Sequence, residues 1–145
     1  MDGWITVVPF SGAGGLLIGL LIYQNILRVP VRSPKLQAVA GAISEGAMAF
    51  LRREYQILAL FIIVIAFLLA WQLGVETAAA FLSGAVCSIL AGFWGMKAAT
   101  RANVRTAQAA MEQGEGEALL MAFNGGSVMG LCVASLGLLG VGIFY

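Results

Sequence analysis

The sequence contains no histidine, and charged residues make up only 10% of its 145 residues. A soluble domain of average composition carries about 25% charged residues. Because 61% of the residues are hydrophobic, the composition predicts a polytopic, all-α membrane protein. The missing histidine excludes metal sites built on imidazole. The two cysteines, Cys87 and Cys132, lie in apolar segments, and we interpret them as small buried hydrophobic residues.

Four segments are long and apolar enough to cross a bilayer, which takes about 20 residues of helix. We predict spans at residues 5–27, 57–73, 77–96 and 118–145. None of the four spans carries a charged side chain in its apolar interior. Ionisable groups at membrane depth mark ion pathways, so their absence argues against a rotor-type proteolipid and a small multidrug exporter. Each of those proteins needs a carboxylate within a span.

Basic residues occur in only two parts of the chain, residues 28–53 and 97–105. By the positive-inside rule these parts are cytoplasmic, which places both chain ends outside. On a helix, side chains four residues apart share one face. Lys97, Arg101 and Arg105 therefore form one cationic stripe where the third span ends, and Arg52 and Arg53 precede the second span. We interpret these five residues as topology anchors.

Helical segments are also predicted between the spans, on the cytoplasmic side. Ser33 and Pro34 form a typical helix start, with the serine as N-cap and the proline at the first helical position. Residues 34–55 are amphipathic. They lie at the membrane surface or project from it as an extension of the second span. Residues 97–117 form a basic helix followed by a flexible acidic turn.

Small residues recur at four-residue spacing in the third and fourth spans. Such ridges let neighbouring helices approach closely in a membrane. We predict helix packing at two ridges, Gly84, Ser88, Gly92 and Gly126, Gly130, Ala134.

The cytoplasmic carboxylates do not form a recognisable catalytic set. Glu45 and Glu54 are interpreted as ion-pair partners of nearby arginines, and the glutamates of residues 112–117 as a solvated charge run. We therefore expect no catalytic, cofactor-binding or metal-ligating residue in this chain, no cofactor bound by it and no nucleic-acid partner. By its own residues the chain is a scaffold.

Four sequence blocks together resemble the N-terminal part of the membrane-integral pyrophosphatases, which are pyrophosphate-energised proton or sodium pumps. The blocks are EGAMAFLRREY (residues 45–55), GFWGMKAATRANVRTAQAA (residues 92–110), EALLMAFNGGSVMGL (residues 117–131) and ASLGLLG (residues 134–140). They follow one another in the family's order and spacing.

The resemblance implies a much larger homodimer that hydrolyses magnesium pyrophosphate on the cytoplasmic side and moves H+ or Na+ outward. In that family the ligands of Mg2+ and pyrophosphate lie in later helices, beginning with a motif of the form D-V-G-A-D-L-V-G-K. This sequence lacks the motif. The first four helices then belong to an outer ring around the catalytic core. The implied partners are the lipid bilayer and the remaining helices of the pump, in a bacterial-type inner membrane.

We therefore expect a fragment or truncated product of such a pump, inactive alone. The alternative is a free-standing four-span protein for assembly or interaction, in which the two small-residue ridges would serve association. A small drug or ion transporter is disfavoured by the uncharged spans.

Overall fold

The computed structural model describes residues 3–144 and the side chains of residues 7–142. This part is built from four helices, α1 (Gly3–Arg28), α2 (Pro34–Gln72), α3 (Val75–Glu112) and α4 (Glu115–Phe144), and contains no strand. All four helices are long and apolar enough to cross a membrane. The prediction of an all-helical membrane protein with four spans is confirmed. Tyr145, with which the predicted fourth span ends, lies outside the described residues.

Helices α2 and α3 are much longer than a membrane span. They contain 39 and 38 residues, which corresponds to a length of almost 60 Å at about 1.5 Å per residue. The hydrocarbon core of a bilayer is only about 30 Å thick. The amphipathic residues 34–55 are therefore one continuous helix with the apolar residues that follow, and do not form a separate surface helix. The position of the membrane boundary along α2 stays a prediction.

The start of α2 has the predicted capping arrangement. Ser33 is in an extended conformation, its side chain accepts a hydrogen bond from the backbone N–H of Leu36, and Pro34 opens the helix. The carbonyl of Ser33 accepts the N–H of Gln37 at 3.0 Å. These bonds satisfy N–H groups that have no partner within the helix.

The turns after α2 and α3 share one construction. Each has a glycine with positive φ, Gly74 at 96° and Gly114 at 93°, a conformation that L side chains rarely adopt. The carbonyl of each glycine accepts the first hydrogen bond of the next helix, from Ala78 and Ala118 respectively. The turns are short, so each joins two antiparallel helices.

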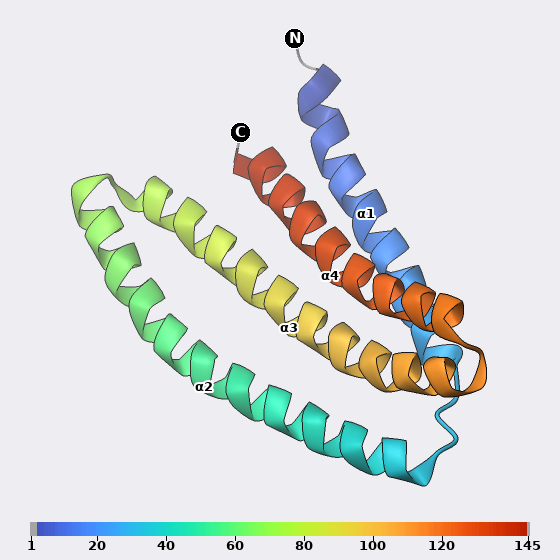
Figure 1. Ribbon diagram of the computed structural model, residues 1–145. Coiled ribbons are helices and arrows are strands. Elements are labelled where there is room, and N and C mark those ends of the chain that lie inside the picture. The colour runs from blue at the N-terminus through green and yellow to red at the C-terminus, as the bar shows by residue number, and fades with distance from the viewer. Residues whose placement is uncertain (1–2, 145) are drawn as a thin grey trace.

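The helices form an open layer in the order α2, α3, α4, α1 (Figure 1). Helix α2 packs against α3 alone, whereas α1 packs mainly against α4 and makes a smaller contact with α3. Both ends of the described chain lie on the same side as the turn between α2 and α3 (Figure 1). The link between α1 and α2 and the turn between α3 and α4 lie at the opposite end. Which of the two ends faces the cytoplasm remains a prediction from the charges.

The core lies where α1, α3 and α4 meet. Its buried members are Ile26, Ala98, Ala102 and Val128, and Ile26 is the only large side chain that is fully buried among the described residues. Two of these four residues are alanines, and small side chains let helices approach closely in a bilayer. Helix α2 instead exposes a series of large apolar side chains: Phe50, Ile57, Leu60, Phe61, Ile63, Phe67 and Trp71.

Candidate functional site

A buried arginine on α3 closes the end of α1. The guanidinium of Arg105 donates hydrogen bonds to the carbonyls of Val29 at 2.9 Å and Leu27 at 3.4 Å, and to that of Arg101 in its own helix at 2.8 Å. The carbonyls at a helix C-terminus lack partners within the helix and carry partial negative charge. Arg105, which is 9% exposed, therefore serves as a C-terminal cap for α1. Burial, and second the positive charge of Arg101, lower the pKa of Arg105 from its ordinary value.

Gln108, one turn further along α3, holds the link between α1 and α2. Its side-chain oxygen accepts the backbone N–H of Arg32 at 2.8 Å, and its amide nitrogen donates to a carboxylate oxygen of Glu112 at 3.2 Å. Gln108 is buried. Arg105 and Gln108 thus form a polar junction that fixes the end of α1 and the following link against α3. Sequence reasoning missed Gln108, whose only signal is its position three residues after Arg105 on the same helix face.

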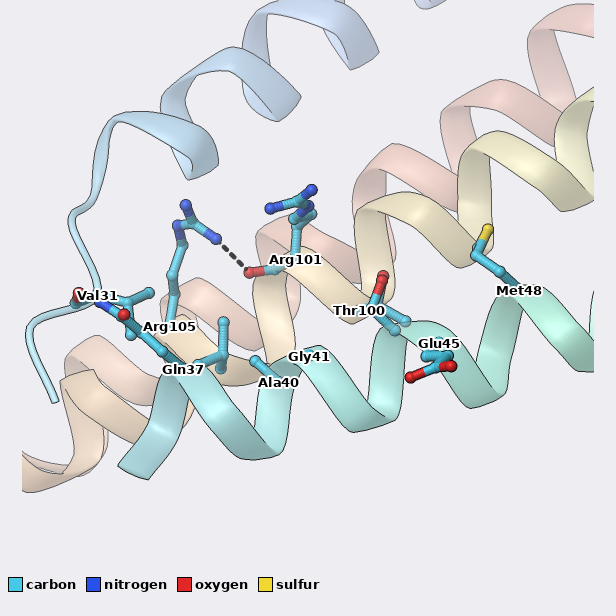
Figure 2. Close-up of a pocket in the computed structure, with 11 residues that line it drawn as sticks. Val31, Gln37, Ala40, Gly41, Glu45, Met48, Thr100, Arg101 and Arg105 are labelled. Atoms are coloured by element: carbon cyan, nitrogen blue, oxygen red, sulfur yellow. Dashed lines mark hydrogen bonds between the residues drawn. The ribbon is translucent and has the colours of Figure 1, made fainter. Parts of the chain in front are cut away.

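An open groove lies between the N-terminal half of α2 and the C-terminal half of α3 (Figure 2). Its volume is about 630 Å³, and its polar lining includes Gln37, Ser44, Glu45, Thr100, Arg101 and Arg105. The side chains of Glu45 on α2 and Arg101 on α3 do not point toward one another (Figure 2).

The groove lining does not form a catalytic set. The hydroxyl of Thr100 donates to the carbonyls of Met96 and Lys97 in its own helix, at 3.0 and 3.1 Å. The lining contains no histidine, so the usual general base for a hydroxyl nucleophile is missing. Arg101, Arg105 and Glu45 give the groove two positive charges and one negative charge, and this set assigns no reaction.

The sequence model of the family described as "Inorganic H+ pyrophosphatase" matches residues 13–145, which is most of the chain. The chain belongs to this family. The similarity noted in the four sequence blocks is therefore confirmed at the level of the family.

Individual relatives of the pyrophosphatase family match nearly the whole chain. A K(+)-insensitive pyrophosphate-energized proton pump of Methanosarcina mazei is 39% identical over 147 residues, covering 100% of this chain and 22% of the relative. A K(+)-insensitive pyrophosphate-energized proton pump of Moorella thermoacetica is 41% identical, covering 96% and 20%. A K(+)-stimulated pyrophosphate-energized sodium pump of Thermotoga maritima is 45% identical, covering 85% and 17%. The chain spans about a fifth of the length of the curated relatives it matches.

The pyrophosphatase resemblance implies Mg2+, for which carboxylates are the preferred protein ligands. Within residues 3–144, no three His, Cys, Asp or Glu side chains lie together so that they could hold a metal ion. Glu112, Glu115 and Glu117 are all exposed. The described residues do not form a magnesium site, and no step of pyrophosphate chemistry is assigned to them.

The predicted topology anchors differ in their surroundings. Arg52, Arg53 and Arg101 are exposed and Lys97 is half-buried, whereas Arg105 is buried at the junction. The three cations of α3 are therefore not one uniformly exposed stripe, and Arg105 bonds to protein carbonyls. Anchoring at the membrane surface stays a prediction for all five residues.

The predicted small-residue ridges do not lie where the four helices meet, with one exception. Gly92 faces α2, since a Cβ atom there would be 3.1 Å from the hydroxyl oxygen of Tyr55. The other five residues are exposed: Gly84, Ser88, Gly126, Gly130 and Ala134. Their role in helix packing stays a prediction, and it concerns partners outside this four-helix layer.

The close helix contacts use other small residues that do not belong to the two ridges. A Cβ atom on Gly125 of α4 would lie 2.5 Å from the Cβ of Ala102 on α3, and one on Gly12 of α1 would lie 2.8 Å from the carbonyl oxygen of Ser135 on α4. Gly15 also faces Ser135. These contacts hold α1, α3 and α4 together.

Proposed function

We propose that this chain forms the N-terminal four-helix portion of a pyrophosphate-energised ion pump, which couples hydrolysis of magnesium pyrophosphate to H+ or Na+ transport. The family match over residues 13–145 carries this proposal. The relatives are about five times as long as the part that aligns with this chain. In the complete homodimeric pump, Mg2+ and pyrophosphate would be bound by helices that this sequence does not contain, so the chain alone is inactive.

The surface of the layer supports a role as a scaffold. Helix α2 has only α3 as a neighbour, and the ridge of Gly126, Gly130 and Ala134 on α4 is exposed. Small exposed ridges suit close contact with further helices. We therefore assign to the four helices the positioning of neighbouring helices within a bacterial-type inner membrane, as an outer layer of the pump.

The ion is selected outside this segment. A proton pump and a sodium pump match the chain at 39% and 45% identity. Both kinds of pump therefore contain a segment related to these four helices. The spans also lack a charged side chain in their interiors, and such a side chain is the usual mark of an ion pathway.

The test is a pair of chimeric pumps. The chain replaces the matching segment in the proton pump of Methanosarcina mazei and in the sodium pump of Thermotoga maritima. We expect each chimera to hydrolyse magnesium pyrophosphate and to transport the ion of its parent, measured as vesicle acidification and as 22Na+ uptake. A well-inserted chimera without pyrophosphate hydrolysis would contradict the scaffold role. A change of ion would contradict selection outside this segment.

The chain expressed alone is the control for the second function, a free-standing assembly protein. In vesicles it should hydrolyse no pyrophosphate. A stable homo-oligomer that is lost on Gly130→Leu, together with inactive chimeras, would favour assembly over the pump.

A further inference from the structure

Aromatic side chains from three helices lie at one level of the layer. The rings of Tyr23 on α1 and Trp94 on α3 meet edge to face, with centroids 6.3 Å apart. The hydroxyl of Tyr55 on α2 donates to the carbonyl of Ile89 on α3 at 2.9 Å. Tyrosine and tryptophan are enriched where a membrane protein crosses from hydrocarbon to headgroups. This level is therefore suited to a membrane interface.

Cations lie at the same level. Lys97 is one turn beyond Trp94 along α3. Because α2 runs antiparallel to α3, Arg52 and Arg53, about one turn before Tyr55, lie beside the same part of α3. Basic residues favour the cytoplasmic headgroup region. The aromatic and basic residues together form an interfacial belt around the layer.

A narrow apolar crevice begins at this belt. Its volume is about 220 Å³, and it is lined by Leu16, Gly19, Leu20, Tyr23, Trp94, Val128 and Cys132. Along α1 the lining runs from Tyr23 away from the belt to Leu16, a rise of about 10 Å at 1.5 Å per residue. A second helix, about 10 Å across, does not fit such a space, whereas part of a single acyl chain does.

Lys97 lies at the belt end of the crevice. Its ammonium nitrogen is 5.2 Å from the ring centroid of Trp94 and 5.8 Å from that of Phe93. The rings hold the side chain by cation–π attraction. Trp94 also lines the crevice, so the fixed positive charge and the apolar lining are continuous. An ammonium group has three hydrogen-bond donors, which suits a phosphate.

We propose that this crevice binds one anionic membrane phospholipid, with an acyl chain along Leu16–Tyr23 and its phosphate at Lys97. The proposal does not depend on the pump function, because it uses only the four helices. Attraction of one lysine for an anionic lipid surface corresponds to a preference of about fivefold over a neutral lipid. The crevice would enrich this lipid over neutral lipids by about the same factor.

The experiment uses Trp94 as the reporter. The chain with Trp4→Phe and Trp71→Phe, which leaves Trp94 as the only tryptophan, is reconstituted in phosphatidylcholine vesicles. Brominated phosphatidylglycerol or brominated phosphatidylcholine is then added at increasing mole fraction, and quenching of Trp94 emission is followed. We expect half-maximal quenching at an about fivefold lower mole fraction of the brominated phosphatidylglycerol.

Matched variants distinguish lipid binding in the crevice from a general attraction of anionic lipid to basic residues. Lys97→Gln should abolish the preference, whereas Arg53→Gln, at the same level on α2, should keep it. Gly19→Leu should fill the crevice and weaken quenching by both lipids. Its Cβ would meet only ordinary contacts, of which the nearest is the Leu131 side chain at 3.5 Å, and far-ultraviolet circular dichroism checks that the variant keeps its helix content.

Equal quenching by the two lipids in the parent chain overturns the proposal. So does a preference that survives Lys97→Gln, or quenching that Gly19→Leu leaves unchanged in a chain with native helix content.

Discussion

Two adjacent glycines in α4 allow a direct test of how the layer is packed. Gly125 faces Ala102 on α3, where a Cβ atom would lie 2.5 Å from the Cβ of that alanine. A Cβ atom on Gly126 would have no neighbouring atom within 4 Å. Two carbon atoms are in optimal contact at about 3.5 to 4.0 Å. Gly125→Ala therefore requires α3 and α4 to move apart by about 1 to 1.5 Å, and neither methyl group can rotate away.

The size of the effect follows from this contact. Overpacking a filled site costs about 1 to 3 kcal/mol. Replacing glycine by alanine in a helix gains about 0.5 to 1 kcal/mol in propensity, but this gain is the same for both glycines. We therefore expect the free energy of unfolding of Gly125→Ala to lie about 1 to 3 kcal/mol below that of Gly126→Ala. Gly126→Ala should be as stable as the parent or slightly more stable.

Equilibrium unfolding in mixed micelles, followed by far-ultraviolet circular dichroism as the denaturing detergent is increased, measures this difference. Ala102→Gly in the Gly125→Ala background moves the single methyl group from one helix to the other. It should recover most of the lost stability, which a double-mutant cycle reports as a coupling energy. Equal stability of the two alanine variants, or no recovery in the double variant, would refute the packing described for α3 and α4.

Three further predictions concern the other contacts of the layer. Arg105→Gln should lower the free energy of unfolding by about 1.5 to 3 kcal/mol because a charged hydrogen bond to the end of α1 is lost. Arg101→Gln, at an exposed site, should change it by less than about 0.5 kcal/mol. Gly12→Ala should be destabilising by about 1 to 3 kcal/mol because its methyl group meets a carbonyl of α4, while Gly14→Ala, in open space, should not. Tyr55→Phe should cost about 0.6 kcal/mol, the average for a hydrogen bond between membrane helices. The same micelle titration checks all three. A pair that does not separate in this way, or a Tyr55→Phe variant as stable as the parent, contradicts the contact it tests.

The sequence predicts the helices well because helix formation in a membrane follows quantities that are read along the chain. Length and apolarity predict the four spans, and the Ser33–Pro34 pair predicts the start of α2 because capping is a local interaction. The glycines at the two turns act locally as well. No knowledge of which helices are neighbours is needed for any of these features.

The contacts between helices could not be predicted in the same way. Helix α4 carries small residues on more than one face, and Gly125 and Gly126 differ by about 100° around the axis of a helix with 3.6 residues per turn. The four-residue spacing favoured the ridge that begins at Gly126, whereas the contact uses Gly125. Nothing local distinguishes the two, because the choice depends on where Ala102 lies in three dimensions.

The contacts of Arg105, a charged residue, could not be predicted from the sequence either. Its spacing from Lys97 and Arg101 predicts a surface stripe, but its bonds are to Leu27 and Val29, 78 and 76 residues away. A buried arginine is tolerated only where carbonyls or acids surround it. That requirement is met by the exposed carbonyls at the end of α1, which become visible only once α1 and α3 are side by side.

Helix α2 is held less firmly in the layer than the other three helices. Helices α1, α3 and α4 are fixed by close contacts between small residues and by the cap at Arg105, whereas α2 contacts only α3. The link that leads into α2 is nevertheless held by Gln108 through the N–H of Arg32. This one bond fixes the link against α3 just before α2 begins. The C-terminal half of α2, which contains the predicted span, has no second helix of this layer beside it. Its remaining surface is therefore left to lipid or to further helices.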